Sequence, residues 1–105
     1  MNQEERTKYI DLGHTQPGWN NLIKELDSKL SILDPNYTIL QIKEKFGGLR
    51  YYFEANFEKA EEMFKLELEY EGKSFKICEE CGSEDDVTTE GSWLKTFCKK
   101  CRTTK

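Results

Sequence analysis

The 105-residue sequence has a single histidine, His14, and it lacks an apolar run of the about twenty residues that a membrane-spanning helix needs. Nothing around the one histidine indicates a Ser-His-Asp or Cys-His arrangement, and the glycine patterns of Walker and dinucleotide-binding motifs are absent. These absences argue against an enzyme. We therefore expect a protein with no catalytic residues and no membrane contact.

Basic residues are in the minority, because 16 lysines and arginines stand against 20 aspartates and glutamates and leave a net charge of −4. A dedicated duplex-DNA-binding domain is usually basic, so this balance argues against one. The charge is uneven, however. Acidic residues dominate from Glu54 to Glu90, whereas Lys43 to Arg50 and Lys95 to Lys105 are basic. The sequence therefore predicts a polarised surface.

The sequence also shows no apolar signal segment near its start, which reads Met1-Asn2-Gln3-Glu4-Glu5. Secretory signals combine a short basic region with an apolar stretch of 7–15 residues. We therefore expect a cytoplasmic protein, in a reducing compartment where disulfides are rare.

Four cysteines form two Cys-x-x-Cys pairs, Cys78 with Cys81 and Cys98 with Cys101. Two such pairs on either side of a small insert can place four sulfurs around one tetrahedral Zn²⁺, at about 2.3 Å each. All four ligands would be thiolates, so no position stays open for water or substrate and the zinc would be structural. Two disulfides or four free thiols are the alternatives, and a reducing compartment favours zinc. With four cysteines completing the site, His14 is expected at the surface or at a helix cap.

The insert between the cysteine pairs has the composition of two short strands. Val87 to Thr89 and Trp93 to Phe97 are rich in β-branched and aromatic residues, and Glu90 to Ser92 would form the turn between them. Each cysteine pair is expected in a tight turn, and Gly82 stands where the chain must reverse with a positive φ. These features predict a zinc ribbon over residues 75–105.

The first half of the chain begins with residues 1–16, whose mixed charge and lack of periodicity predict a flexible arm. From Pro17 to Leu33, apolar residues recur at steps of three and four, which is typical of one helix face. Thr15 is a candidate N-cap, and Asp34-Pro35 should end this helix. We expect the helix to cover the core, with Trp19 packed inside rather than stacking on a ligand.

Thr38 to Ala55 predict a β-hairpin that turns at Gly47-Gly48, because both central positions of a type I′ turn need a positive φ. This turn would place Lys45 opposite Arg50, with an apolar face packed under the first helix. The opposite face would carry one tyrosine and three cations: Lys43, Lys45, Arg50 and Tyr52.

The basic face of this hairpin is a candidate binding site. Like charges opposed across a strand pair are destabilising, and a bound anion would relieve the repulsion between Lys45 and Arg50. Two lysines, an arginine and a tyrosine ring suit an anionic small molecule, a nucleotide or single-stranded nucleic acid. Alternatively, Gln41, Glu54 or the acidic helix that follows neutralises the cations within the fold.

A second helix is predicted from an N-cap at Asn56 to about Tyr70, ended by Gly72. Its apolar face would consist of Phe57, Ala60, Phe64 and Leu68, with Met63 beside it. Its acidic residues are either a solvated face or a contact surface for a basic protein: Glu61, Glu62, Glu67, Glu69 and Glu71. The predicted fold is α+β, with a helix, hairpin and helix core over residues 17–74 and the zinc ribbon at its end.

Several of these motifs together resemble a group of small bacterial and phage-borne zinc-ribbon proteins. The resemblance rests on Gly18-Trp19, on the hairpin segment Gln41 to Tyr52, on Cys78 to Gly82, and on Trp93 to Cys98. It covers most of residues 17–101 and departs at Cys101, since the last ligand in the group is often histidine. It implies a bacterial or phage origin and a cytoplasmic setting, and it carries no activity with it.

Two functions fit these features. The first is a non-catalytic zinc-ribbon binding protein that engages an anionic ligand through the basic hairpin face. The second is an acidic adaptor or inhibitor whose second helix meets a host protein. We favour the first, because it gives the opposed Lys45 and Arg50 a purpose.

Overall fold

The computed structural model describes residues 1–12 and 16–103, and it has the predicted α+β fold. Its elements follow in the order α1 (Gln3–Leu12), the 3-10 turn η1 (Pro17–Trp19), α2 (Asn20–Leu33), β1 (Thr38–Lys45), β2 (Gly48–Glu54), α3 (Ala60–Ser74), β3 (Thr88–Glu90), β4 (Lys95–Phe97) and α4 (Lys99–Thr103). Strands β1 and β2 form one antiparallel sheet, and β3 and β4 form another. Within the described ranges, every helix is too short or too polar to cross a bilayer.

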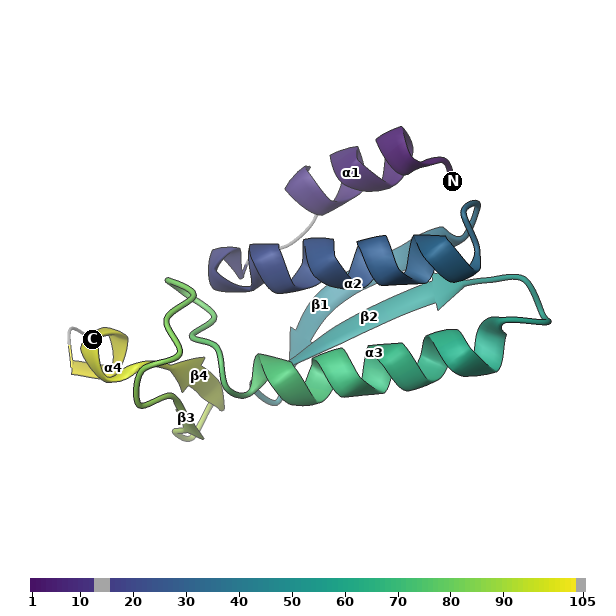
Figure 1. Cartoon of the computed structure of the whole chain (residues 1–105). Coiled ribbons are helices and arrows are strands. Elements are labelled where there is room, and N and C mark those ends of the chain that lie inside the picture. Colours follow the sequence, from purple (N-terminus) through teal and green to yellow (C-terminus); the bar gives the residue numbers. More distant parts are fainter. Residues whose placement is uncertain (13–15, 104–105) are drawn as a thin grey trace.

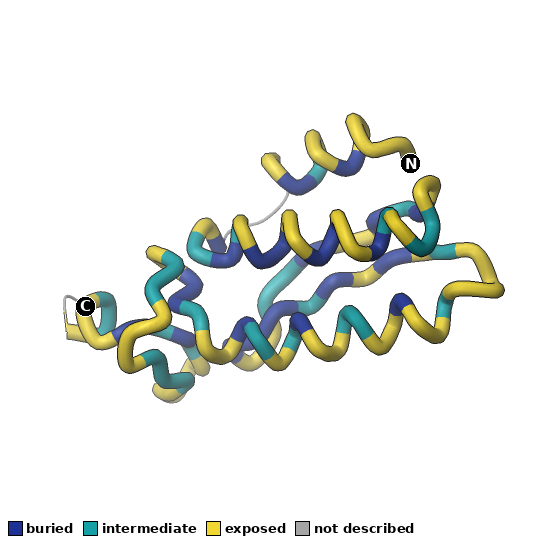
Figure 2. Tube along the Cα trace, viewed as in Figure 1, coloured by how far each residue is buried: buried dark blue, intermediate teal, exposed yellow. Residues whose placement is uncertain are grey.

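Helices α2 and α3 flank the β1-β2 hairpin, and α1 packs on the outer side of α2 (Figure 1). The buried positions of the helices lie toward the hairpin and the exposed positions lie away from it (Figure 2). The core is formed by Trp19, Leu22, Ile23, Leu26, Leu30, Tyr37, Ile39, Ile42, Leu49, Tyr51, Phe53, Met63 and Tyr70, together with Ile10 of α1. As predicted, the first long helix covers this core, Trp19 is fully buried, and Asp34 ends the helix in an extended conformation.

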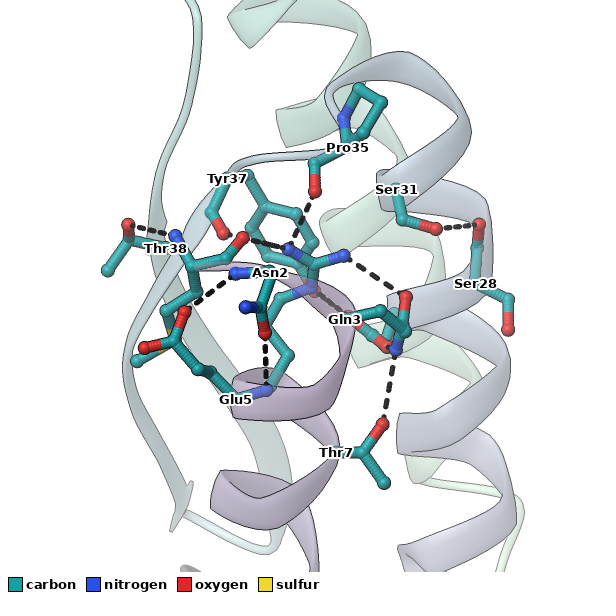
Figure 3. A network of polar contacts seen from close by, with 12 residues as sticks. Asn2, Gln3, Glu5, Thr7, Ser28, Ser31, Pro35, Tyr37 and Thr38 are labelled. Carbon is teal, nitrogen blue, oxygen red and sulfur yellow. Dashed lines mark hydrogen bonds and ion pairs between the residues drawn. The ribbon is translucent and has the colours of Figure 1, made fainter.

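Residues 3–12 form a helix, so the prediction of a flexible arm over residues 1–16 is wrong for this part. The helix starts with a capping box, in which Asn2 Oδ1 accepts the Glu5 N–H at 2.8 Å and Glu5 Oε1 accepts the Asn2 N–H at 2.9 Å (Figure 3). Arg6 and Ile10 are the buried side chains of α1. Because one of the two is an arginine, the helix has no apolar stripe to detect. The predictions for His14 and Thr15 lie outside the described residues.

The buried Arg6 is held by a polar network between α1, α2 and the hairpin, part of which is drawn in Figure 3. Arg6 Nε lies 2.8 Å from Asp27 Oδ1, and its Nη1 donates to the Tyr37 carbonyl at 3.1 Å. The Tyr37 hydroxyl donates to Asp27 at 2.5 Å and lies 2.6 Å from the Tyr51 hydroxyl. Burial raises the pKa of both tyrosines. The network satisfies the buried Arg6 and Asp27 charges and fastens α1 to the core.

The hairpin turns at Phe46 and Gly47, one residue earlier than predicted, with φ values of 55° and 84°. Lys43 therefore lies opposite Arg50, and the predicted pairing of Lys45 with Arg50 is wrong. Gly48 is needed for close packing rather than for the turn, because an added Cβ would lie 2.4 Å from the Phe75 ring. This contact comes from a distant residue, so the local turn pattern could not reveal it.

Helix α3 also differs from its prediction. It begins at Ala60 with no side-chain cap and runs past Gly72 to Ser74. The expected apolar residues Phe57, Phe64 and Leu68 are exposed, and the buried ones are Met63, Tyr70 and Ser74.

The cause is the position of α3 along the free edge of β2. The Ser74 hydroxyl accepts the Leu49 N–H at 2.9 Å, and Glu67 Oε2 accepts the Tyr51 N–H at 3.3 Å. These bonds satisfy edge N–H groups that would otherwise be open to pairing with another strand. The face that packs on the sheet must therefore carry polar residues, so apolar periodicity selected the wrong face.

Candidate metal centre

The four cysteine sulfurs meet at one point near the C-terminus. The Sγ atoms of Cys78, Cys81, Cys98 and Cys101 all lie within 4.8 Å of one another, and Cys81 Sγ is 3.6 Å from Cys98 Sγ. A tetrahedron of sulfurs at about 2.3 Å from a metal has edges of about 3.8 Å. All four thiols are free of disulfides. The structure thus brings the predicted ligands together at a spacing that fits one tetrahedral metal ion.

The first cysteine pair lies in a tight backbone turn. The Gly82 N–H donates to the Cys78 carbonyl at 2.9 Å, and the Cys78 N–H donates to the Ser83 carbonyl at 2.8 Å. Gly82 has a φ of 83°, as its place after the second ligand predicted. This reversal turns the chain around the site, so that Cys78 and Cys81 present their sulfurs to the same point.

The second cysteine pair is held differently from the tight turn that was expected. Cys98 directly follows β4, and Cys101 lies in α4. The Arg102 N–H donates to the Cys98 carbonyl at 3.0 Å, which is the helical i to i+4 bond. The β3-β4 hairpin and the first turn of α4 therefore carry the second pair back to the first.

The backbone around Cys78 favours its thiolate. Burial acts to raise the pKa of Cys78, but hydrogen bonds from the Cys81 and Cys98 N–H groups outweigh it and lower the pKa to about 7. The pKa of Cys101 is raised, first by burial and then by the neighbouring thiols. Thiolates this close repel one another, so full ionisation of the set requires a cation among them.

The first cysteine turn is packed against the start of the first long helix. An added Cβ on Gly18 would lie only 2.0 Å from the Cys78 carbonyl oxygen. The Gly18 N–H donates to the Glu79 carbonyl at 2.9 Å, and Trp19 Nε1 donates to the Ile77 carbonyl at 2.9 Å. Gly18 and Trp19 therefore join the core to the metal centre, a role that sequence reasoning did not assign to them.

The hairpin turn is the second attachment point of the segment that carries the cysteines (residues 78–101, the metal segment). Thr96 Oγ1 donates to the Gly47 carbonyl at 2.5 Å and lies 2.7 Å from Thr89 Oγ1. The Thr96 N–H donates to Glu79 Oε2 at 3.1 Å, and the Glu79 N–H donates to the Thr96 carbonyl at 2.9 Å. The turn between β1 and β2 is thus fixed to the β3-β4 hairpin.

The residues predicted for ligand binding share the side of the hairpin away from the core (Lys43, Lys45, Arg50 and Tyr52, the outer hairpin face). Lys43 Nζ lies 5.6 Å from the centre of the Tyr52 ring, and Lys45 Nζ lies 5.6 Å from that of Phe46. Arg50 Nη1 lies 3.2 Å from Glu71 Oε1. The acidic helix therefore neutralises Arg50, whereas among the described residues neither lysine has a carboxylate within 4.0 Å.

Fold and site together define a small α+β protein with a cluster of four cysteines that could hold a metal ion. In comparisons with known proteins, no protein-family model, no curated protein and no solved structure matches the chain. The resemblance to bacterial and phage-borne zinc-ribbon proteins stays a prediction.

Proposed function

We propose that this chain is a non-catalytic binding protein, in which a structural Zn²⁺ holds the metal segment against the core and the outer hairpin face binds an anionic ligand. The ligand is a nucleotide or single-stranded nucleic acid. The observation that carries the proposal is the arrangement of Lys43 and Lys45. Both lysines lie on one side of the sheet beside aromatic rings, and no described carboxylate pairs with them.

The donor set supports zinc as the metal. Four thiolates in a tetrahedral arrangement are typical of structural zinc sites, and they leave no open coordination position for chemistry. Zinc would fix the two cysteine pairs to each other and, through Gly18 and Gly47, to the helix and hairpin of the core. We expect native mass spectrometry to find one zinc ion per chain, lost under denaturing conditions. A spectrum without metal would contradict this part.

Charge on the outer hairpin face supports an anionic ligand. Lys43 lies directly opposite Arg50, so the like-charge opposition remains although its partner differs from the prediction. Glu71 offsets the arginine, while neither lysine has a described carboxylate within 4.0 Å to offset its charge. A flexible lysine beside an aromatic ring is suited to a phosphate whose base lies against that ring.

The double variant Lys43→Ala/Lys45→Ala tests the ligand. Fluorescence anisotropy would follow binding of labelled ATP and of oligothymidylate of about twelve nucleotides, a length within the usual range of such sites. Loss of two phosphate contacts should lower the slope of log affinity against log salt by about 1.4. Lys8→Ala/Lys65→Ala removes the same charge from exposed positions on α1 and α3 and should bind like the wild type. Equal binding by both double variants would contradict the proposed site.

A second candidate function is contact with a basic protein through α3. It is favoured by the exposure of Phe64 and Leu68, which lie on the same helix as exposed glutamates. Glu67 and Glu71 are engaged with β2, so this surface would rest on Glu61, Glu62 and Glu69. A partner captured by the wild type should be lost when these three become glutamine. Retention of that partner would argue against the surface.

A further inference from the structure

A hollow of about 470 Å³ lies between the turn of the β1-β2 hairpin and the link from β3 to β4. It is lined by Glu44, Lys45, Phe46, Ser92, Trp93 and Leu94. This volume falls within the range of small-molecule sites, and the walls are mostly apolar. Of these six residues, Lys45 is already assigned to ligand binding and the other five are not, and the hollow lies at the turn end of the same hairpin.

Two aromatic rings line the hollow and remain exposed. Phe46 is 64% exposed and Trp93 is 76% exposed. Phe46 also has a φ of 55°, at the first central position of the two-residue turn, where asparagine, aspartate and glycine are the favoured residues. The turn thus holds a bulky ring at a strained position without burying it. Strain of this kind is concentrated at functional sites.

The two backbone segments that carry the walls of the hollow are bonded to each other before any ligand arrives. Thr96 Oγ1 donates to the Gly47 carbonyl next to Phe46, and Thr89 Oγ1 bonds to Thr96 across the β3-β4 pair that carries Trp93 in its link. On the hairpin side, the Gly47 N–H donates to Glu44 Oε2 at 2.7 Å. The acidic side chain of the lining is therefore already hydrogen-bonded within the hairpin. A site fixed in this way loses little conformational entropy on binding.

Aromatic rings and lysines alternate from the middle of the hairpin to the hollow. The Tyr52 ring lies beside Lys43, and the Phe46 ring lies beside Lys45, each with its cation 5.6 Å from the ring centre. Trp93 continues the series on the other wall of the hollow. Rings that stack with successive bases and cations that follow the phosphates are the combination that binds single strands without sequence preference.

We propose that the hollow is a base-stacking subsite and that the anionic ligand is single-stranded nucleic acid. Bases stack on Phe46 and Trp93, while Lys43 and Lys45 contact the connecting phosphates. The inference rests on the proposed function, since the outer hairpin face supplies the phosphate contacts. It adds Phe46, Trp93 and Leu94 to the site and favours an oligonucleotide over a mononucleotide.

Intrinsic fluorescence offers a direct readout, because the chain has two tryptophans and Trp19 is fully buried. Titration of the zinc-loaded protein with oligothymidylate of about twelve nucleotides should quench the Trp93 emission as the bases stack. Trp93→Leu and Phe46→Asn should each weaken binding by about five- to 150-fold. Asparagine tolerates positive φ, so Phe46→Asn should keep or improve the melting temperature while it removes the ring.

The matched control is Phe57→Leu, which removes an exposed ring from the segment between β2 and α3, past the end of the hairpin remote from its turn. It should bind within about twofold of the wild type, a change below the cost of one stacking ring. Oligonucleotide binding that Trp93→Leu and Phe46→Asn leave unchanged would overturn the inference and leave the proposed function standing. If ATP binds as tightly as the oligonucleotide and the Trp93 emission stays constant, the inference is also overturned, and the proposed function again stands. If the wild type binds neither, the proposed function fails, and the inference fails with it.

Discussion

Gly18 shows how one missing side chain can join two parts of a protein. Its Cα lies so close to the first cysteine turn that an added Cβ would be 2.0 Å from the Cys78 carbonyl oxygen and 2.6 Å from the Gly82 nitrogen. Both neighbours are backbone atoms of a turn that positions metal ligands, so neither can rotate out of the way. The same glycine also donates its N–H to the Glu79 carbonyl.

We therefore expect Gly18→Ala to lower the free energy of unfolding by about 1–3 kcal/mol, the usual cost of overpacking. Since the turn must shift with its cysteines, zinc affinity should fall by about tenfold or more, as is common when groups behind the ligands are changed. Urea denaturation and competition with a chromophoric chelator would measure the two effects.

Gly72→Ala is the matched control for this change. Gly72 lies within α3 and an added Cβ meets no atom within 4 Å. Alanine is favoured over glycine inside a helix, so this variant should gain about 0.5–1 kcal/mol in stability. Its zinc affinity should equal that of the wild type. Equal zinc affinity in Gly18→Ala would show that the close contact does not position the ligands.

Among whole elements, α3 has an unusual place because it covers the edge of β2 with side-chain acceptors. Glu67 accepts the Tyr51 N–H while half-buried. Burial, and next the nearby Glu71 carboxylate, raise the Glu67 pKa to about 7 from an ordinary value of 4.5. The hydrogen bond from the Tyr51 N–H, and next the Arg50 charge, act in the other direction and lower this pKa.

The raised pKa gives the α3-β2 contact a pH dependence with a defined sign. The folded state favours the protonated carboxyl, so the stability that Glu67 contributes is present below its unfolded pKa of 4.5 and is lost as pH rises through about 7. Glu67→Gln mimics the protonated form and can still accept the Tyr51 N–H. Its urea midpoint should exceed that of the wild type at about pH 8 and match it near pH 4.5.

Glu61→Gln removes an exposed carboxylate from the same helix and serves as the control. Its urea midpoint at about pH 8 should not exceed that of the wild type, because it keeps the Glu67 carboxyl. If Glu67→Gln behaves in the same way, the Glu67 carboxyl is already ionised in the folded protein and the contact has no such dependence.

The elements also show where sequence patterns succeed and where they fail. The helix with Trp19 and the cysteine pairs were predictable because their signals are local: an apolar spacing in one case and a ligand spacing in the other. The prediction of the hairpin register was wrong because Gly48 serves the close approach of the Phe75 ring rather than the turn, and that ring comes from a distant segment. The prediction of the buried face of α3 was wrong because the helix covers a strand edge, and the N–H groups of that edge need polar acceptors, here Glu67 and Ser74.

Helix α1 and the hollow were missed for related reasons. Arg6 is 1% exposed, and a buried arginine gives no apolar signal until its partner Asp27 is known. The exposed rings of Phe46 and Trp93 are 47 positions apart in the sequence, and the bond between Thr96 and Gly47 brings their segments together. Patterns read along one segment contain no information about such pairings.

For the whole molecule, the metal should decide whether the C-terminal third stays attached to the core. Thiolates gathered without a cation repel one another, so chelation of zinc should release the metal segment from Gly18 and Gly47. In a Trp93→Phe background, Trp19 is the remaining tryptophan. Its emission should shift to longer wavelength on chelation, because its indole N–H loses the Ile77 carbonyl and the site opens to water.

Hydrogen exchange gives the control within the same sample. Amides of Gly18, Glu79 and Thr96, which bond between the core and the metal segment or within that segment, should lose protection on chelation. Amides in the middle of α2 should lose much less, since the helix stays packed on the hairpin. Unchanged Trp19 emission and unchanged exchange would show that the segment stays docked without its metal.

The bond from Trp19 to Ile77 spans 58 positions, and the bond from Thr96 to Gly47 spans 49. During synthesis, therefore, the first long helix and the hairpin emerge from the ribosome well before the residues that complete them. Until Ile77 and Thr96 follow, the indole N–H of Trp19 and the carbonyl of Gly47 lack the partners that they have in the folded chain. Contacts this distant slow folding, because a long loop must close before they form. Arrival of the last cysteine pair, and capture of the metal, would then be the step that closes the core at the Trp19 end.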